Sequence, residues 1–331
     1  MKIGLFWDVA INIESYYVND GGAYKFKDGL PYVYHHSVSP RCFTATHNYP
    51  FMWGNGCFLN LSEWTELPDY DLDLIFYACE RGGLINETKE KYSVDRLRKK
   101  YKTAKIIGYL KEVSVRSGRE ENRIEFLKSC DYIHAEAVTG MKTISEFLSI
   151  EKQVGKKLNF SSQPINIKYM YDNYYTNEKQ LCIYAYLPNP IHRRGSTYAF
   201  SEYLGKKYNI PVIYKPLTPD QKFDYMSQHD FVKMWSKCMF HFNLDPALIQ
   251  PGGQCCQVAN VGSINFGGLN ESHDILYPTT SGNDLKYLEK KFVEVLNDKN
   301  KQFEIIEYAW NKLNEVYSFN TVKSQIESLY K

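Results

Sequence analysis

The stretch AKIIGYLKEVSVRSGREENRIEFLKSCDYIHAEA, residues 104–137, contains two apolar runs separated by one amphipathic segment. The runs 104–110 and 131–137 have the length and apolar content of strands, and residues 120–129 have helical spacing of their apolar side chains. Strands this apolar, joined through a helix, are typical of a parallel sheet that is covered on both faces. The stretch therefore predicts an α/β fold.

The same alternation extends through the first half of the chain. Further strands are predicted at 2–7, 73–78 and 166–171, and further helices at 89–101 and 143–157. Residues 20–65 interrupt the pattern with glycine, proline, histidine and many aromatic residues, so we expect an irregular excursion there.

A polar segment, residues 174–180, precedes a second series of strands and helices. Its strands are predicted at 180–187, 210–217, 239–244 and 263–268, and its helices at 197–208, 229–238 and through the tail 284–318. We therefore predict a first domain over 1–175, a second over 176–305 and a closing helix over 306–331. Two Rossmann-like parallel-sheet domains of this kind face a cleft at the carboxyl ends of their strands, where ligands bind.

The composition is that of a globular protein with nearly balanced charge. The chain has 331 residues, 44% of them hydrophobic, and 40 basic residues against 38 acidic ones leave a formal net charge of +2. This balance excludes a strongly cationic nucleic-acid binder, but a local basic groove depends on where charges are placed.

The sequence contains no apolar run as long as a membrane span, and its start, MKIGLFWDVAINIE, lacks the features of a signal peptide. The eight cysteines are scattered without a CxxC pair, so we expect reduced thiols that lie mostly in the core. These features predict a cytoplasmic protein without a membrane partner, and we expect a monomer.

A first candidate site lies in YLPNPIHRRGSTYAF, residues 186–200, where a strand ends and a helix starts. His192, Arg193 and Arg194 would lie at the helix N-terminus, with Gly195 and Ser196 beside them. Helix-end N–H groups, the helix dipole and guanidinium groups together favour a diphosphate. The alternative is a solvated basic turn that Ser196 caps.

A second candidate is QPGGQCCQVANVGSINFGG, residues 250–268. The adjacent Cys255 and Cys256 have the wrong spacing for a zinc site, and a disulfide between them would need a strained turn. A short helix after the PGG turn would instead place both thiols against the sheet as small core residues.

The glycines and glutamines of this segment carry its chemical interest. Gly252 and Gly253 would direct free N–H groups toward the expected cleft. Gln254 and Gln257 are three residues apart, so they would share one face of the helix. Gln257 could hydrogen-bond a ribose diol.

A third candidate is the pair Lys111 and Glu112, which directly follows the strand 104–110. A carboxylate at that edge could act as general base for an acceptor hydroxyl. The alternative is an ordinary surface ion pair at the start of a loop.

Two further motifs have simpler explanations. The acidic run DYDLD, residues 69–73, resembles a metal-binding Asp-x-Asp motif, but it leads into a strand, at the amino edge of the sheet. His35 and His36 lie in the excursion, where they could contact an acceptor or simply be solvated.

This pattern resembles the two-domain GT-B nucleotide-sugar glycosyltransferases, and within them the bacteriophage DNA glucosyltransferases that modify hydroxymethylated bases. The segments that carry the resemblance are MKIGLFWD (1–8), DYDLDLIFYACERGG (69–83), AKIIGYLKEVS (104–114), RRGS (193–196) and CQVANVGSINF (256–266).

The resemblance implies roles for individual residues. Glu112 falls on the position of a catalytic acidic residue, and Arg193 and Arg194 fall on the basic residues that bind the donor diphosphate. Gln257 occupies the place of a glutamate that holds the donor ribose, and Ile249 stands where the larger superfamily often has another glutamate. A neutral Gln257 can still bond a ribose hydroxyl, but it would bind less firmly.

The resemblance implies a metal-independent hexosyl- or pentosyltransferase. It would use a UDP-sugar as donor substrate, and its favoured acceptor would be a hydroxymethylated base in double-stranded phage DNA, in the host cytoplasm. Arg116 and Arg119 would then contact DNA phosphates, and Lys111 would steer phosphates. The alternatives are a glycosyltransferase for a glycan, lipid or protein acceptor, a nucleotide-sugar epimerase, and a non-catalytic nucleotide or nucleic-acid binding module.

Overall fold

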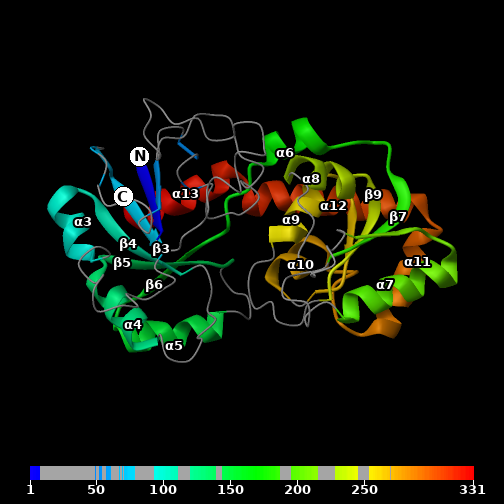
Figure 1. Cartoon of the computed structure of the whole chain (residues 1–331), viewed down its shortest axis with the longest axis horizontal. Coiled ribbons are helices and arrows are strands. Elements are labelled where there is room, and N and C mark those ends of the chain that lie inside the picture. The colour runs from blue at the N-terminus through cyan, green and yellow to red at the C-terminus, as the bar shows by residue number, and fades with distance from the viewer. Residues whose placement is uncertain are drawn as a thin grey trace, which may run out of the picture. The chain divides into compact units, whose positions relative to one another are not determined.

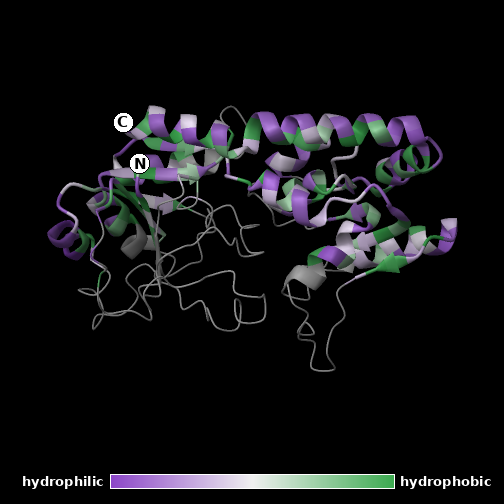
Figure 2. Cartoon of the chain, turned by 90° about the horizontal axis from the view of Figure 1, so that it is seen from above, coloured by the Kyte–Doolittle hydropathy of each residue, from purple (hydrophilic) through white to green (hydrophobic). Residues whose placement is uncertain are grey.

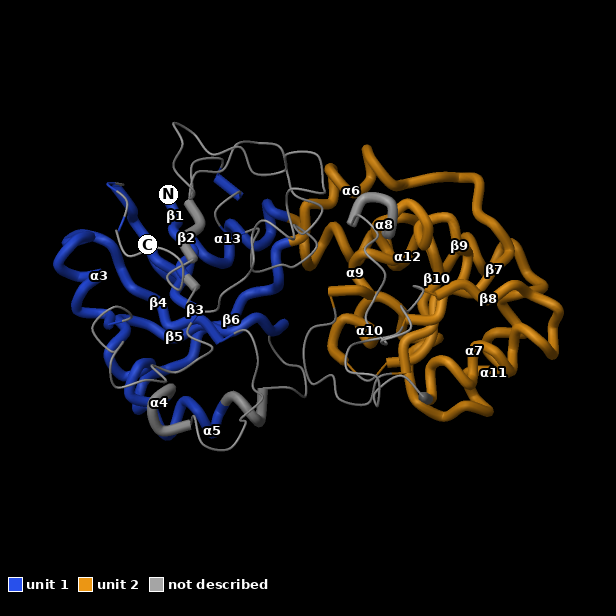
Figure 3. The backbone as a smooth tube through the Cα atoms, in the orientation of Figure 1, with its two compact units in different colours: residues 1–164, 319–331 blue, residues 165–318 orange. Residues whose placement is uncertain are grey.

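The chain folds into two compact units, which Figure 3 shows in different colours. Unit 1 comprises Met1–Pro164 and Phe319–Lys331, and unit 2 comprises Ile165–Ser318. The computed structural model describes residues 1–7, 49, 52–53, 57–60, 67, 69, 71–78, 93–110, 120–138, 144–186, 195–214, 228–244, 253–268 and 270–331.

Unit 1 is built on a six-stranded parallel sheet with the strand order β2-β1-β3-β4-β5-β6 (Figure 1). This order reverses between β1 and β3, as in doubly wound α/β folds. Its strands are β1 (Ile3–Trp7), β2 (Cys57–Asn60), β3 (Leu74–Ala78), β4 (Lys105–Leu110), β5 (Tyr132–Glu136) and β6 (Leu158–Ser161).

Both faces of this sheet are covered, and successive side chains of β3 point to opposite faces. Phe76 packs in the cluster that includes Ile326 of the C-terminal helix α13, whereas Tyr77 packs in the cluster that includes Leu97 of α3. Every residue of β3 is consequently buried. The described helices of this unit are α3 (Val94–Lys100), α4 (Glu120–Ser129), α5 (Ile144–Val154) and α13 (Phe319–Tyr330).

Unit 2 has a four-stranded parallel sheet with the order β10-β9-β7-β8. Phe240 and Phe242 face the aliphatic and aromatic cluster formed with α7 and α11, and His241 between them points to the other face. The strands are β7 (Gln180–Ala185), β8 (Val212–Ile213), β9 (Cys238–Phe242) and β10 (Ile264–Phe266).

The helices of unit 2 include the long amphipathic α12, whose buried residues fall on one side. The C-terminal helix α13 of unit 1 also mixes hydrophobic and hydrophilic residues along its length, as the colours in Figure 2 show. The helices of unit 2 are α6 (Ile167–Tyr174), α7 (Gly195–Tyr208), α8 (Gln228–Ser236), α9 (Gly253–Asn260), α10 (Glu271–Leu276), α11 (Leu285–Leu296) and α12 (Lys299–Tyr317).

The prediction of two α/β units on parallel sheets is confirmed, but the strand predicted at 166–171 is wrong. This segment forms α6, because the side chain of Asn166 accepts a hydrogen bond from the Tyr169 backbone N–H at 3.3 Å and caps the helix. Ile167, Met170 and Tyr174 form its buried face at intervals of three and four residues. The sheet of unit 1 ends instead with β6, an edge strand that directly follows the helix predicted at 143–157.

The unit boundaries also differ from the expected ones. The chain divides after Pro164 and not after residue 175, because α6 packs against α8 and α9 of unit 2. The single closing helix expected over 306–331 is two helices, since Ser318 has extended backbone angles and ends α12. The segment 20–65 contains the strand β2, and residues 20–48 lie outside the described part of the chain.

None of the helices in the described ranges combines the length and the apolar character that crossing a bilayer requires.

Candidate functional site at the carboxyl edge of unit 2

The strand order of unit 2 places a topological switch point between β7 and β9. From β7 the chain continues to β8 on one side of the sheet, whereas β9 lies on the other side. Ligands of open α/β sheets bind outside the carboxyl ends of the strands at such a point. The carboxyl ends of β7 and β9 are Ala185 and Phe242, so the candidate site lies beyond these two residues.

Two helices begin on this edge. α7 starts at Gly195, in the connection that follows β7, and α9 starts at Gly253, in the connection that follows β9. The first turns of both helices carry backbone N–H groups without a partner inside the helix, together with the positive end of the helix dipole. This arrangement favours an anion such as a diphosphate.

The first turn of α7 is tied to the segment that follows β9. The Thr197 hydroxyl is fully buried and accepts a hydrogen bond from the Leu244 backbone N–H at 2.9 Å. Gly195 is the first helical residue, so the exposed Ser196 lies inside the first turn and does not cap the helix. The bond holds the N-terminus of α7 beside the end of β9.

The start of α9 carries amide groups as predicted. Gln254 is half-buried, and its Oε1 accepts a hydrogen bond from Nδ2 of the buried Asn243 at 3.3 Å. Its Nε2 is buried and has no hydrogen-bond partner among the described residues, so this donor is available to a ligand. Gln257 follows three residues later, on the same side of the confirmed helix.

The two adjacent cysteines face the core, as the sequence predicts. Cys255 and Cys256 are fully buried and unbridged, and both thiols contact Ser272 of α10, at 3.5 Å to its carbonyl oxygen and 3.8 Å to its hydroxyl. Burial raises the pKa of the Cys255 thiol well above its ordinary value. These thiols therefore support the position of α9 and do not reach the edge.

Beyond β10 lies a polar group that sequence reasoning missed. Gly267 and Gly268 have φ angles of +86° and +87°, and a Cβ on Gly268 would lie 2.6 Å from the His273 ring. His273 is fully buried, and its Nδ1 lies 2.8 Å from Oδ1 of Asn270, which also caps α10. Burial lowers the pKa of His273 to about 3, so its ring is neutral. The glycine pair before an Asn-initiated helix is the signal that could have identified this group.

The carboxyl edge of unit 1 holds a second missed side chain. Glu136 ends β5 and is only 6% exposed, which makes it a buried carboxylate at the edge where strand ends gather. It satisfies the criterion that singled out Glu112, namely an acidic residue directly at the end of an apolar strand. β4 ends at Leu110, so Lys111 and Glu112 follow its carboxyl end in the chain.

The acidic run 69–73 lies at the amino edge of unit 1, as predicted. Asp69 pairs with Lys100 at 2.9 Å, Asp71 pairs with Lys2 at 3.4 Å, and Asp73 accepts a hydrogen bond from the Lys2 backbone N–H at 2.7 Å. Ion pairs and this bond therefore account for all three carboxylates.

Several predicted site residues lie outside the described ranges, and their positions stay predictions. These residues are His35, His36, Lys111, Glu112, Arg116, Arg119, His192, Arg193, Arg194 and Gly252.

No protein-family model matches the sequence, and no curated protein matches it. Among solved structures, the chain is similar to an alpha-glucosyltransferase in complex with UDP-glucose and DNA containing an abasic site, at 13% identity, with 100% of both chains covered and a TM-score of 0.62. An alpha-glucosyltransferase in complex with UDP and a 13-mer DNA containing a central A:G mismatch matches at 12% identity, covering 100% of this chain and 99% of that one, with a TM-score of 0.63.

A sucrose-phosphate synthase from Thermosynechococcus elongatus matches at 11% identity over 100% of this chain and 98% of that one, with a TM-score of 0.55. At such low identities the likeness shows the fold. The predicted GT-B type of fold is thereby confirmed.

Proposed function

We propose that this protein is a glycosyltransferase that moves a sugar from a UDP-linked donor to the hydroxyl of a hydroxymethylated base in DNA. The observation that supports it best is the likeness over the whole length of both chains to alpha-glucosyltransferases solved with UDP-glucose or UDP and with DNA. The helix N-termini and the Gln254 amide at the switch point of unit 2 fit a nucleotide diphosphate.

In this proposal unit 2 binds the donor. His192, Arg193 and Arg194 precede α7 and neutralise the diphosphate as charge develops on the leaving group. Backbone N–H groups from Gly195 and Ser196, and from Gly252 and Gly253, contact the phosphates or the sugar.

The glutamines of α9 complete the donor site. Gln254 donates through its buried Nε2, and Gln257 holds the ribose diol. As neutral amides, both bind the donor by hydrogen bonds and not by charge, so the positive charge of the site comes from the residues before α7.

Unit 1 provides the acceptor side. Glu112 removes the proton from the acceptor hydroxyl, which implies inversion at the sugar, whereas retention would follow if Glu112 only positions the sugar. Lys111 steers phosphates. The base is flipped out of the duplex to reach the site, with Arg116 and Arg119 on the phosphates and His35 and His36 near the acceptor. The enzyme works without a metal ion, as a cytoplasmic monomer.

The deciding experiment incubates the protein with a panel of nucleotide sugars and either hydroxymethylated or unmodified DNA. Mass spectrometry of the digested nucleosides should detect a hexose or pentose added only to hydroxymethylated bases. Transfer without DNA would instead indicate a glycan, lipid or protein acceptor, and donor conversion without any acceptor would indicate an epimerase. Donor binding without turnover would indicate a non-catalytic module.

The catalytic assignment is tested by Glu112→Gln. This variant should bind the UDP-sugar with unchanged affinity in calorimetry and lose transfer by about 10²-fold or more, because it cannot accept the proton. Glu125→Gln is the matched control, since Glu125 is an exposed carboxylate of α4 whose one ion pair among the described residues is with Lys128. If Glu112→Gln transferred sugar as fast as that control, Glu112 would not be the general base.

A further inference from the structure

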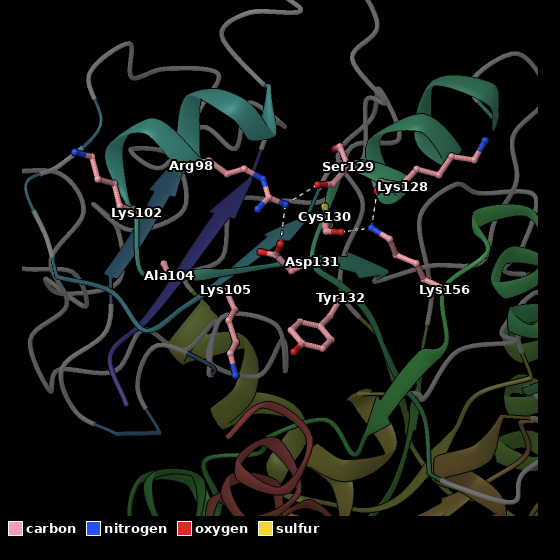
Figure 4. A pocket seen from close by; sticks show the side chains of 10 residues that line it. All are labelled: Arg98, Lys102, Ala104, Lys105, Lys128, Ser129, Cys130, Asp131, Tyr132 and Lys156. Atoms are coloured by element: carbon pink, nitrogen blue, oxygen red, sulfur yellow. Dashed lines mark hydrogen bonds and ion pairs between the residues drawn. The ribbon is translucent and has the colours of Figure 1, made fainter.

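Unit 1 has a basic groove at the amino edge of its sheet, on the side opposite the carboxyl ends of β4 and β5 (Figure 4). Its volume is 710 Å³. The charged residues that line it are Arg98, Lys102, Lys105, Lys128, Lys156 and Asp131.

Separate segments bring these charges together. Arg98 lies in the last turn of α3, Lys128 lies in the last turn of α4, and Lys105 is the first residue of β4. β4 has six residues, so its first and last residues are about 17 Å apart at the usual rise of a strand. The groove is therefore a different place from the acceptor edge of unit 1.

Part of this charge has a structural role, because two helices end here. Arg98 donates to the carbonyl oxygen of Ser129 at 2.8 Å. Lys156 donates to the carbonyl oxygen of Lys128 at 2.5 Å and to that of Cys130. Cations at these positions satisfy the last carbonyl groups of α4 and complement the negative end of its dipole.

Capping does not neutralise the groove, since a carbonyl group has no net charge. Among the described residues, carboxylate partners exist for Arg98, with Asp131 at 2.7 Å, and for Lys128, with Glu125 at 2.8 Å. In the described part of the chain Lys156 bonds only carbonyl oxygens, so no described carboxylate compensates its charge. Its ammonium group has three donors, which leaves capacity for a ligand.

Two further lysines, one in the turn before β4 and one at its first residue, also lack a carboxylate partner among the described residues. Lys105 donates to the Tyr330 carbonyl oxygen at 2.5 Å and lies 5.9 Å from the centroid of the Tyr132 ring. Lys102 is exposed and has no ion pair or hydrogen bond within the described part of the chain. Three uncompensated cations thus share one hollow in a protein whose net charge is only +2.

We propose that this basic groove binds the phosphodiester backbone of a nucleic acid without reading its sequence. Clustered lysines attract backbone phosphates through counterion release, and an aromatic ring beside them adds a surface for a base or sugar. Figure 4 shows the Tyr132 ring beside Lys105 among the cations. The choice of nucleic acid rests on the proposed function, in which DNA is the acceptor.

The test uses Lys102→Gln combined with Lys128→Gln, because neither lysine donates to a helix-end carbonyl group. Lys152→Gln combined with Lys312→Gln is the matched control. Lys152 is an exposed lysine like Lys102, and Lys312 pairs with Glu315 three residues away, as Lys128 pairs with Glu125. Both double variants remove two positive charges. A difference in their affinity for DNA therefore depends on where the charges lie and not on how many were removed.

Binding is measured by fluorescence anisotropy with a short labelled duplex of unmodified DNA, without donor, over a range of salt concentrations. The groove variant should bind roughly tenfold more weakly at low salt, and its plot of log K against log salt should be flatter by about 1.8. The control variant should match the wild type, and thermal melting should show that both variants are folded.

Equal affinity and equal salt slope in the two double variants would overturn the proposal. Inorganic tripolyphosphate is the second probe, since free phosphates share the chemistry of a backbone. Loss of tripolyphosphate binding without loss of duplex binding would assign the groove to free phosphates and reject the nucleic acid. Because no donor is present, the outcome does not depend on whether the wild type transfers sugar.

Discussion

The two units each bury a histidine in an interior strand of a parallel sheet, and the surroundings of the two rings differ. His134 on β5 of unit 1 and His241 on β9 of unit 2 are both fully buried. Burial lowers the pKa of each ring to about 3, with the charge of Lys179 adding to the effect at His241. Both rings are therefore neutral in the folded protein.

The ring of His134 is held by hydrogen bonds on both sides. Its Nδ1 lies 2.8 Å from the Tyr330 hydroxyl, and its Nε2 lies 3.0 Å from the Ser161 hydroxyl and 3.2 Å from that of Tyr49. Tyr330 belongs to α13, which is separated from β5 in the sequence by most of the second half of the chain. The network therefore fastens the C-terminal helix to the sheet of unit 1.

The ring of His241 is held by packing. It lies 5.2 Å from the Tyr184 ring and 5.3 Å from the Trp235 ring, measured between centroids. Neither of its nitrogens has a well-formed hydrogen bond within the described residues. The comparison shows that the same residue type at the same depth can be a hydrogen-bonding centre in one unit and a packing element in the other.

The largest expected effect is that of acid on the two units. Burial lowers the pKa of two described histidines in unit 2, His241 and His273, and of His134 in unit 1, from 6.5 to about 3. Below pH 6.5 the unfolded chain takes up protons that the folded chain does not bind until about pH 3, so stability falls as the pH falls. Between pH 7 and 5 each histidine should cost about 2 kcal/mol, which is about 4 kcal/mol for unit 2 and about 2 for unit 1.

Urea unfolding at pH 7 and pH 5, followed by hydrogen exchange in peptides from each unit, measures the two losses separately. Unit 2 should lose its protection first on acidification. The comparison would be contradicted if unit 1 lost its protection from hydrogen exchange first, or if the stability of neither unit changed between pH 7 and pH 5.

The second prediction replaces each ring by one without polar atoms. His134→Phe should lower the free energy of unfolding by about 2–4 kcal/mol, because it leaves three buried hydroxyl groups short of a partner. His241→Phe should change it by less than about 1 kcal/mol, since within the described residues the imidazole makes only weak backbone contacts, at Trp235 and Cys238, and no well-formed hydrogen bond. Urea titration of both variants provides the values, and equal losses would show that His241 has a polar role.

The smallest effect compares two helix-ending tyrosines. Tyr330→Phe removes the hydroxyl bonded to His134, and Tyr317→Phe removes the hydroxyl that lies 3.1 Å from the Ser272 hydroxyl in unit 2. Each should cost about 1 kcal/mol, with Tyr330→Phe at the upper end because it also leaves a buried imidazole nitrogen short of its partner. Thermal melting of the two variants measures the difference in stability. A larger loss of stability for Tyr317→Phe than for Tyr330→Phe would contradict this prediction.

Local patterns predicted most of the elements correctly. The strands β1, β3, β4 and β5 lie within one residue of their predicted ranges, because short runs rich in apolar residues are buried inside a sheet that is covered on both faces. The segment of α6 was misjudged because tyrosines and isoleucine favour strands, and only the cap at Asn166 and the spacing of the buried residues favour a helix.

The candidate site was predictable where it depends on the start of an element. The helix at Gln254 and Gln257 and the inward-facing Cys255 and Cys256 followed from a glycine turn before a short amphipathic segment. Glu136 and His273 each had a local signal, the end of an apolar strand and a glycine pair before a helix, but their burial depends on what packs over them and could not be predicted from that signal.

The sequence by itself determined that this chain forms two parallel-sheet units, since the apolar runs and helical spacings lie within ten or fifteen residues of one another. Only the tertiary structure decided which distant side chains meet. His134 and Tyr330 are 196 residues apart in the chain, and the groove brings together Arg98 and Lys156 from the first and last of three separate stretches of the chain. The physical reason is that element type depends on local periodicity, whereas sites depend on packing between segments that the sequence does not place side by side.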